Sequence, residues 1–78
     1  MKIKVVVTLK KGVLDPQGKA IQQTLNGMSF TNIKEIRQGK FFEISVNENN
    51  ETLAKEQVEE MCKKLLVNLV IEDYKIIQ

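Results

Sequence analysis

Hydrophobic and polar residues alternate along residues 2–9, which is the pattern of a β-strand with one buried face. The other face of this strand is half polar, and Val6 is its one aliphatic residue. We therefore predict a strand over residues 2–9 in a sheet that is covered on one side only. The aliphatic face consists of Ile3, Val5, Val7 and Leu9.

The pattern then changes to helical spacing at Ala20, Ile21, Thr24, Leu25 and Met28, which predicts a helix that starts at Asp15-Pro16. Asp15 can accept hydrogen bonds from the unpaired N–H groups of the first turn, and Pro16 suits the first helical position. Gly27 is expected to end the helix in the left-handed conformation. Gly18 costs about 1 kcal/mol relative to alanine inside a helix, which indicates that another segment packs closely against it.

Four more elements follow before the C-terminus, three strands and one helix. Residues 33–37 and 40–46 are predicted as two strands of a hairpin, joined by a turn at Gln38-Gly39. Residues 51–66 show the clearest helical periodicity, with glutamates toward the start and Lys63 and Lys64 near the end, as the helix dipole favours. Residues 70–77 are predicted as the last strand.

The resulting order, β-α-β-β-α-β, is that of the ferredoxin-like fold. We predict one α+β domain over residues 1–78, a four-stranded antiparallel sheet with both helices on one face because crossovers are right-handed. The other face would stay open and apolar, which favours self-association. Its candidate residues are Val6 and Phe41 with either Tyr74 and Ile76 or Ile71 and Ile77.

The composition argues against membrane-spanning, secreted and dedicated nucleic-acid-binding proteins. No apolar run approaches the roughly 20 residues of a membrane span, and Met1–Leu9 lacks the apolar block of a secretory signal. We therefore expect no membrane partner. The single cysteine, Cys62, cannot form an internal disulfide, which fits a reducing compartment, so we expect a cytoplasmic protein. The net charge of +2 divides into +6 over residues 1–40 and −4 over residues 41–78, which is too small a basic excess for a dedicated nucleic-acid-binding protein.

Catalytic constellations are missing from the sequence. The chain has no histidine, which excludes a Cys/His zinc site, a Ser-His-Asp triad and a Cys-His dyad within it. Cys62 lies in an apolar stripe and is predicted to be a core residue, because reactive thiols need electropositive, exposed surroundings. The neighbouring pair Glu72-Asp73 does not share one face of a strand and is expected to be solvated. We predict no catalytic residue, metal site or cofactor site on this chain.

Two segments partly match known motifs. Residues 12–20 resemble a phosphate-binding P-loop, but Ala20 replaces the Ser or Thr that would hold Mg²⁺. Arg37–Phe42 resembles an RNA-stacking strand, but the first predicted strand has no aromatic residue for a second base. Lys10 and Lys11 beside a helix N-terminus leave open the binding of an anion or of a partner's carboxylate.

The residues from Leu9 to Ile21, LKKGVLDPQGKAI, closely resemble the signature of the PurS family, the small subunit of phosphoribosylformylglycinamidine synthase. Residues 37–40 and residues 61–72 resemble the hairpin and the C-terminal pattern of the same family. Ser29 and Leu69 depart from it, because the family commonly has glycine and proline at these positions.

The resemblance implies a role in purine biosynthesis. A glutaminase subunit, PurQ, releases ammonia, and a synthetase subunit, PurL, uses it to convert formylglycinamide ribonucleotide into formylglycinamidine ribonucleotide. The resemblance implies that this chain is a non-catalytic bridge between them and a homodimer or higher oligomer. It carries no cofactor of its own, and the ATP, Mg and glutamine of the complex bind elsewhere.

Partner contacts are expected in the polar, tightly turned segments that core packing does not explain. The predicted contact residues are Lys11, Gly12, Asp15, Gln17, Gly18, Arg37, Gly39 and Lys40. Two other functions stay open: a ferredoxin-like regulatory domain that senses a small molecule, and an RNA-binding module.

Overall fold

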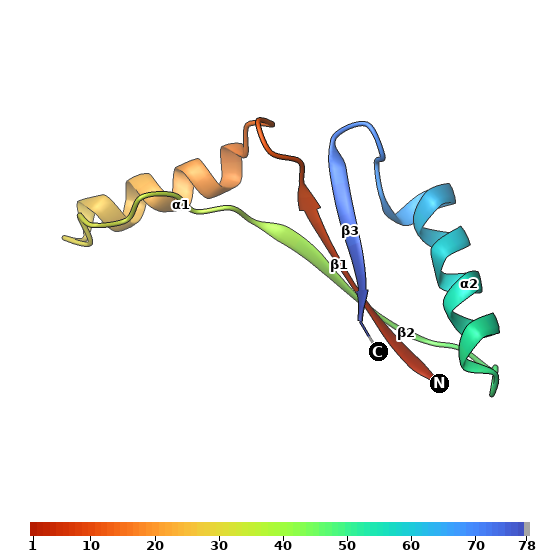
Figure 1. Ribbon diagram of the computed structural model, residues 1–78. Helices are drawn as coiled ribbons and strands as arrows, with labels where there is room; N and C mark the ends of the chain where they lie inside the picture. Colours follow the sequence, from red (N-terminus) through yellow and green to blue (C-terminus); the bar gives the residue numbers. More distant parts are fainter. Residues whose placement is uncertain (78) are drawn as a thin grey trace.

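The computed structural model describes residues 1–77. Its centre is β1 (Lys2–Leu9), the middle strand of a three-stranded antiparallel sheet in the order β2-β1-β3. β2 (Gly39–Ser45) and β3 (Glu72–Ile77) pair with its two edges (Figure 1). The register places Val5 opposite Phe42 on β2 and Ile76 on β3. This pairing turns the predicted aliphatic face of β1 toward the core.

One helix covers that face. α2 (Glu51–Met61) begins at Asn50, whose side chain accepts a hydrogen bond of 3.1 Å from the backbone N–H of Leu53. It continues into a single π-helical turn, η1 (Cys62–Leu66), so the predicted helix over residues 51–66 changes its geometry after Met61. The buried core consists of Ile3, Val5, Val7, Ala54, Val58, Cys62 and Val67.

Cys62 is fully buried, which confirms its predicted place in the core. Burial raises the pKa of its thiol, and the nearby carboxylate of Glu59 raises it further. A buried thiol with a raised pKa is a poor nucleophile because little thiolate forms near neutral pH.

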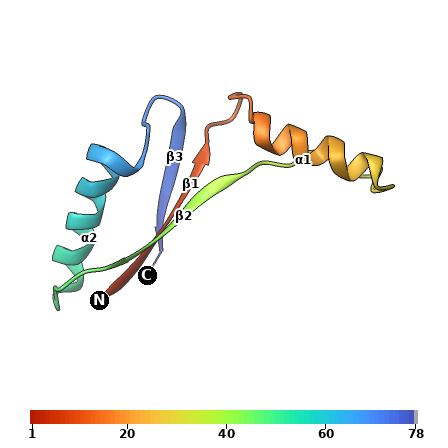
Figure 2. The same cartoon turned by 180° about the vertical axis from the view of Figure 1, so that it is seen from behind.

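α1 (Pro16–Gly27) begins where the sequence predicts, with Asp15 as its N-cap. It does not lie on the sheet. Instead it projects away, and the chain that follows returns alongside it (Figures 1 and 2). The side-chain amide of Gln22 holds this return by donating to the backbone oxygens of Ile33 (3.2 Å) and Lys34 (3.3 Å). We call α1 and its return, residues 16–36, the arm.

The predicted strand over residues 33–37 and its hairpin are therefore wrong. Within residues 1–77 the sheet has three strands, not four, and one helix on its face, not two. The chain passes straight from the arm through Gln38 and Gly39 into β2 (Figure 2). The physical reason is that residues 33–38 find side-chain hydrogen-bond partners, Gln22 and Asp15, which compete with pairing to a strand. The last strand also begins at Glu72, two residues later than predicted.

The end of α1 differs from the prediction as well. The N–H of Ser29 donates to the oxygen of Asn26 (3.2 Å) and the N–H of Phe30 to that of Leu25 (3.0 Å), which is a Schellman motif. Gly27 is the last helical residue, and the left-handed position falls on Ser29, whose φ is 79°. A serine thus occupies a conformation that favours glycine.

The molecule is elongated, measuring 49 × 23 × 15 Å. Its radius of gyration is 16.1 Å, whereas a compact domain of this length would have about 11.5 Å. Its accessible surface is 5979 Å², against about 4,800 Å² for a compact monomer of this mass. A single copy thus leaves roughly 1,200 Å² more surface in water than a compact chain would.

No helix among residues 1–77 is long and apolar enough to cross a membrane.

Candidate interaction site at the base of the arm

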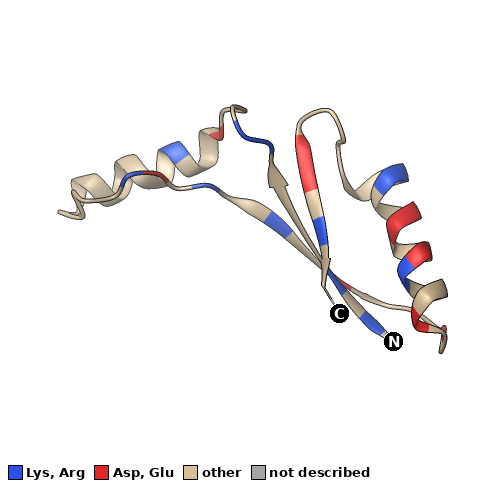
Figure 3. Ribbon diagram, in the orientation of Figure 1, with Lys and Arg blue, Asp and Glu red and all other residues tan. Residues whose placement is uncertain are grey.

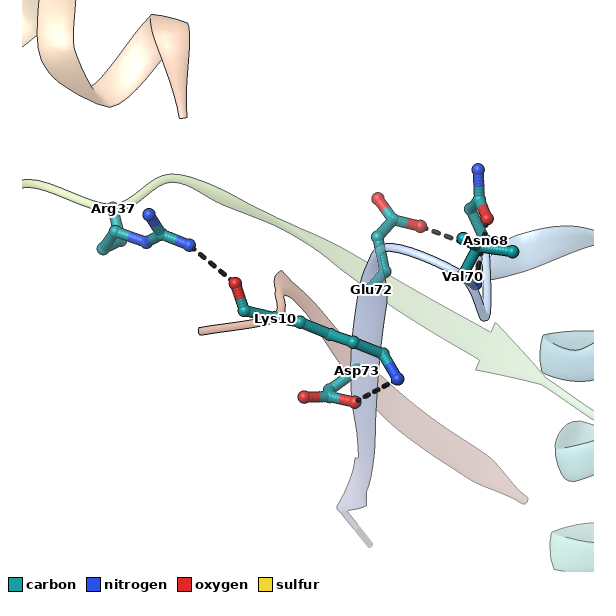
Figure 4. Close-up of polar contacts among 6 residues, drawn as sticks. All are labelled: Lys10, Arg37, Asn68, Val70, Glu72 and Asp73. Atoms are coloured by element: carbon teal, nitrogen blue, oxygen red, sulfur yellow. Dashed lines mark hydrogen bonds and ion pairs between the residues drawn. The ribbon is translucent and has the colours of Figure 1, made fainter. Parts of the chain in front are cut away.

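The structure brings the two predicted contact segments together at one end of the sheet, where the arm joins it. Residues 10–18 lie beside residues 36–40, and the loop of residues 68–73 closes the same end (Figure 4). We call these three segments the junction. Sequence reasoning identified the first two segments as polar and tightly turned but did not place them in contact with each other.

Asp15 is the buried centre of the junction, with 6% of its surface exposed. Its Oδ2 accepts a hydrogen bond of 2.6 Å from the backbone N–H of Gln38, and its Oδ1 accepts one of 3.0 Å from that of Gly18. These two bonds, with the positive charge of Arg37 nearby, hold the pKa of Asp15 below its ordinary value. The carboxylate therefore stays charged at neutral pH and caps α1 while also binding the chain that returns from the arm.

Arg37 also links residues 10–18 to residues 36–40. Its guanidinium donates to two backbone oxygens of the loop before α1, Val13 (2.8 Å) and Lys10 (3.1 Å). Figure 4 shows the bond to Lys10. Because the guanidinium is planar and presents its donors in a fixed fork, its two terminal nitrogens can each hold one acceptor in a defined direction, whereas the donors of lysine share one nitrogen on a flexible stem.

Two glycines allow the backbones of the junction to approach closely. A Cβ atom on Gly18 would lie 2.2 Å from the backbone oxygen of Ile36, and one on Gly39 would lie 2.3 Å from that of Val7. The predicted close packing against Gly18 is thus confirmed, and the segment that packs there is the return of the arm.

Glu72 joins the third segment to β2. Its side chain is only 11% exposed, and its Oε2 lies 3.6 Å from Nζ of Lys40. Its Oε1 accepts a hydrogen bond of 2.7 Å from the N–H of Asn68. The expectation of a solvated Glu72-Asp73 pair is therefore correct only for Asp73, whose side chain is 67% exposed and 3.8 Å from Lys10 (Figure 4).

The eight predicted contact residues fall into two groups. Five of them, namely Asp15, Gly18, Arg37, Gly39 and Lys40, already make contacts within the chain that shape the junction. The other three, Lys11, Gly12 and Gln17, are exposed on its surface. Sequence reasoning missed Gln38, Asn68 and Glu72, because their roles depend on contacts between segments that are far apart in the sequence.

A second feature of the surface is an apolar groove of about 630 Å³ between α2-η1 and the edge strand β2. Leu65 on its rim is 84% exposed. The outer edge of β2 has no strand partner within residues 1–77. The predicted fourth strand would have lain beside this edge. The apolar lining residues are Ile44, Met61, Leu65 and Leu66.

The open face of the sheet carries Val6, Phe41 and Ile77, as their shared register with β1 requires. Tyr74 and Ile76 pack against the core instead, so that set is wrong, and of the other set only Ile77 lies on this face because Ile71 precedes β3. Charged residues share this face, including Lys2 and Glu43, which form a 3.2 Å ion pair, and the arm carries charges as well (Figure 3).

Comparison with known proteins gives one consistent family. Residues 2–78 match the family model described as "PurS: Phosphoribosylformylglycinamidine (FGAM) synthase". The chain is 52% identical over 75 residues to phosphoribosylformylglycinamidine synthase subunit PurS of Methanocaldococcus jannaschii, covering 96% of this chain and 90% of the relative.

Two solved structures resemble the fold. The crystal structure of PurS from Methanocaldococcus jannaschii, described as one of the subunits of formylglycinamide ribonucleotide amidotransferase in the purine biosynthetic pathway, matches with a TM-score of 0.87 at 53% identity over 97% of this chain and 92% of that one. A chain in the structure of PurLQS from Thermotoga maritima matches with a TM-score of 0.89 at 33% identity over 97% of this chain and 93% of that one.

Proposed function

The chain belongs to the PurS family of phosphoribosylformylglycinamidine synthase subunits in purine biosynthesis, and from this premise we propose that it is a non-catalytic bracket between the synthetase PurL and the glutaminase PurQ. In this role it holds the two larger subunits so that ammonia released from glutamine is used in the ATP-dependent conversion of formylglycinamide ribonucleotide into formylglycinamidine ribonucleotide.

The observation that carries this proposal is the similarity to a chain in the PurLQS structure from Thermotoga maritima, in which the three subunits occur together. The shape of the molecule supports it. An elongated chain with an arm at one end and a sheet at the other offers two separate surfaces to two partners. A compact 78-residue domain would not reach as far.

The chemistry of ammonia explains why such a bracket is useful. At neutral pH free ammonia is mostly protonated and diffuses away, so transfer between two active sites requires that they are held in register. Positioning of reactants alone can supply about 7–11 kcal/mol of a barrier. A subunit without catalytic groups can therefore be essential for glutamine-dependent turnover.

We also propose that two copies of the chain associate and complete the ferredoxin-like layer between them. The groove beside β2 is apolar and the edge of β2 is unpaired, which suits a helix and an extended segment. The arm supplies both, and it carries exposed apolar residues, namely Ile21, Met28 and Phe30. The excess surface of roughly 1,200 Å² exceeds the about 800 Å² that each partner contributes to a standard interface.

The junction is proposed as a contact surface for one of the larger subunits. Lys11, Gly12 and Gln17 lie exposed there, next to a loop that Arg37 holds in place. ATP, Mg²⁺ and glutamine would bind to PurL and PurQ, in the cytoplasm, and this chain would need neither a cofactor nor nucleic acid. A ferredoxin-like regulatory domain that senses a small molecule such as an amino acid is the alternative. Calorimetry of the isolated chain with glutamine and nucleotides distinguishes the two, because the bracket predicts little or no heat.

The test of the proposed function is reconstitution with and without this chain. Synthetase and glutaminase are mixed, and turnover is measured with glutamine and separately with ammonium salt. We expect glutamine-supported turnover to depend on the chain and ammonia-supported turnover to be retained without it. Equal glutamine-supported turnover in its absence would contradict the proposal.

A further inference from the structure

Within one copy, the arm is attached to the rest of the chain only at its base. α1 forms no extensive packing with the sheet or with α2, and both views show it projecting away from them (Figures 1 and 2). The chain enters the arm through residues 10–15 and leaves it through residues 37–39. Without further contacts these two peptide connections would form a hinge.

Three hydrogen bonds cross between the entering and leaving segments, and two side chains make all of them. The Asp15 carboxylate accepts from Gln38 at 2.6 Å. The Arg37 guanidinium donates to Val13 at 2.8 Å and to Lys10 at 3.1 Å. We call Asp15 and Arg37 the clamp. Because each of them also lies within a covalent connection of the arm, these bonds fix the direction in which the arm leaves the sheet.

The leverage of the arm makes this direction important. A helix of the length of α1 spans about 18 Å, so a change of 10° at the clamp moves its tip by roughly 3 Å. A displacement of 1 Å can already cost a factor of 10² when reacting groups must be positioned. Small changes at the base are therefore magnified at any partner that the arm contacts.

We propose that the clamp is a positioning device: Asp15 and Arg37 set the angle between arm and sheet, and through this angle they couple glutamine hydrolysis to the use of ammonia. The second half of this inference rests on the proposed function. The first half concerns the chain alone and is tested separately.

Asp15→Asn is the sharpest change because it keeps the size of the side chain. A carboxylate accepts with both oxygens, whereas an amide offers one oxygen and one NH₂ group. Asp15 now binds two N–H groups, those of Gly18 and Gln38. In the variant one of them must face the NH₂ group of the amide, which is also a donor, so that hydrogen bond is lost. Glu56→Gln, the same carboxylate-to-amide change on the exposed surface of α2, is the matched control.

The angle is followed through the distance between two spin labels, one at Gln23→Cys on the arm and one at Ser45→Cys on β2. Pulsed electron paramagnetic resonance measures this distance. The buried thiol of Cys62 stays unlabelled in the folded protein, and excess unlabelled chain restricts the signal to pairs within one copy. We expect one narrow distance distribution in the parent and in Glu56→Gln, and a distribution at least twice as broad or clearly shifted in Asp15→Asn. An unchanged distribution in folded Asp15→Asn would overturn the first half of the inference.

The coupling is measured in the reconstituted complex as glutamate released per formylglycinamidine ribonucleotide formed. We expect Asp15→Asn to join the complex, while glutamine-supported turnover falls at least tenfold and excess glutamate appears. A merely unfolded variant would instead fail to join the complex. If Asp15→Asn does not fold, Arg37→Gln, which loses the fork but keeps the cap of α1, serves in both experiments with the same expectations.

Unchanged coupling in a variant with an altered angle would overturn the second half alone. The proposed function fails separately, when the parent chain itself is not needed for glutamine-supported turnover.

Discussion

The carboxylate of Asp15 accepts a hydrogen bond of 2.6 Å from the backbone N–H of Gln38, although the two residues are 23 positions apart in the sequence. All of the arm lies between these two residues. One short bond therefore closes the loop that the arm forms, and the same carboxylate caps the helix at its start.

This bond predicts a specific dependence of stability on pH. The pKa of Asp15 is lower in the folded chain than in the unfolded chain, where it is about 3.9. Its contribution is therefore fully present above about pH 4 and is lost as pH falls from there through the lowered pKa. We expect the difference in Tm between the parent and Asp15→Asn to be constant from pH 5 to 7 and to shrink below pH 4. Thermal unfolding by circular dichroism measures this difference.

Glu56→Gln serves again as the control in that series, since its carboxylate is exposed on α2. Its Tm should stay close to that of the parent at every pH. A Tm difference for Asp15→Asn that is as large at pH 3 as at pH 7 would show that the charge of Asp15 does not stabilise the junction.

Two glycines of α1 are predicted to respond in opposite directions to alanine. Gly18→Ala places a methyl group 2.2 Å from the backbone oxygen of Ile36, so we expect a loss of about 2–3 kcal/mol in the free energy of unfolding. Gly27→Ala meets no atom within 4 Å and should gain about 0.5–1 kcal/mol from its helix propensity. Urea unfolding of both variants checks the pair, and equal effects would contradict the close approach of the arm's return.

Ser29→Gly should stabilise the chain. Ser29 adopts a φ of 79° at the end of α1, and a left-handed conformation costs an L-residue roughly 1–2 kcal/mol. Glycine removes most of this cost, and a gain of about 1 kcal/mol would raise Tm by about 4–8 °C. Ser45→Gly in β2, where no such conformation occurs, should lower Tm instead.

Sequence patterns identified the regular elements where the local signal was strong. The alternation in β1, the Asp15-Pro16 start of α1 and the apolar stripe of α2 each depend on neighbouring residues, and the structure confirms all three. The weak pattern over residues 33–37 failed because the partners of that segment, Gln22 and Asp15, act from the side of α1 rather than from a strand.

The position of the arm could not be predicted from one chain for a related reason. Rules for crossover handedness assume that each helix buries its apolar face on its own sheet. The apolar residues of α1 remain half exposed here, as Ile21 at 42% shows. For the junction, the sequence identified which residues are unusual, including Asp15, Gly18 and Arg37. It did not indicate that these residues would join the segment that enters the arm to the segment that leaves it.

The exposed groove predicts the effect of a charge on self-association. Leu65→Glu places a carboxylate on the rim of the apolar groove, where a second copy would bury it. Burying an unpaired charge is costly, so we expect the apparent mass in sedimentation equilibrium to fall to that of one chain. Lys63→Glu, an exposed change on the same helical turn, should leave the mass at that of the parent.

The bracket account is tested most directly by the sedimentation of fluorescently labelled glutaminase in the presence of unlabelled synthetase. With this chain added, together with glutamine and nucleotide, the label should move as one fast boundary that contains all three proteins. Without the chain it should sediment at the rate of glutaminase alone. A fast boundary that forms equally well without the chain, or none in its presence, would contradict the account.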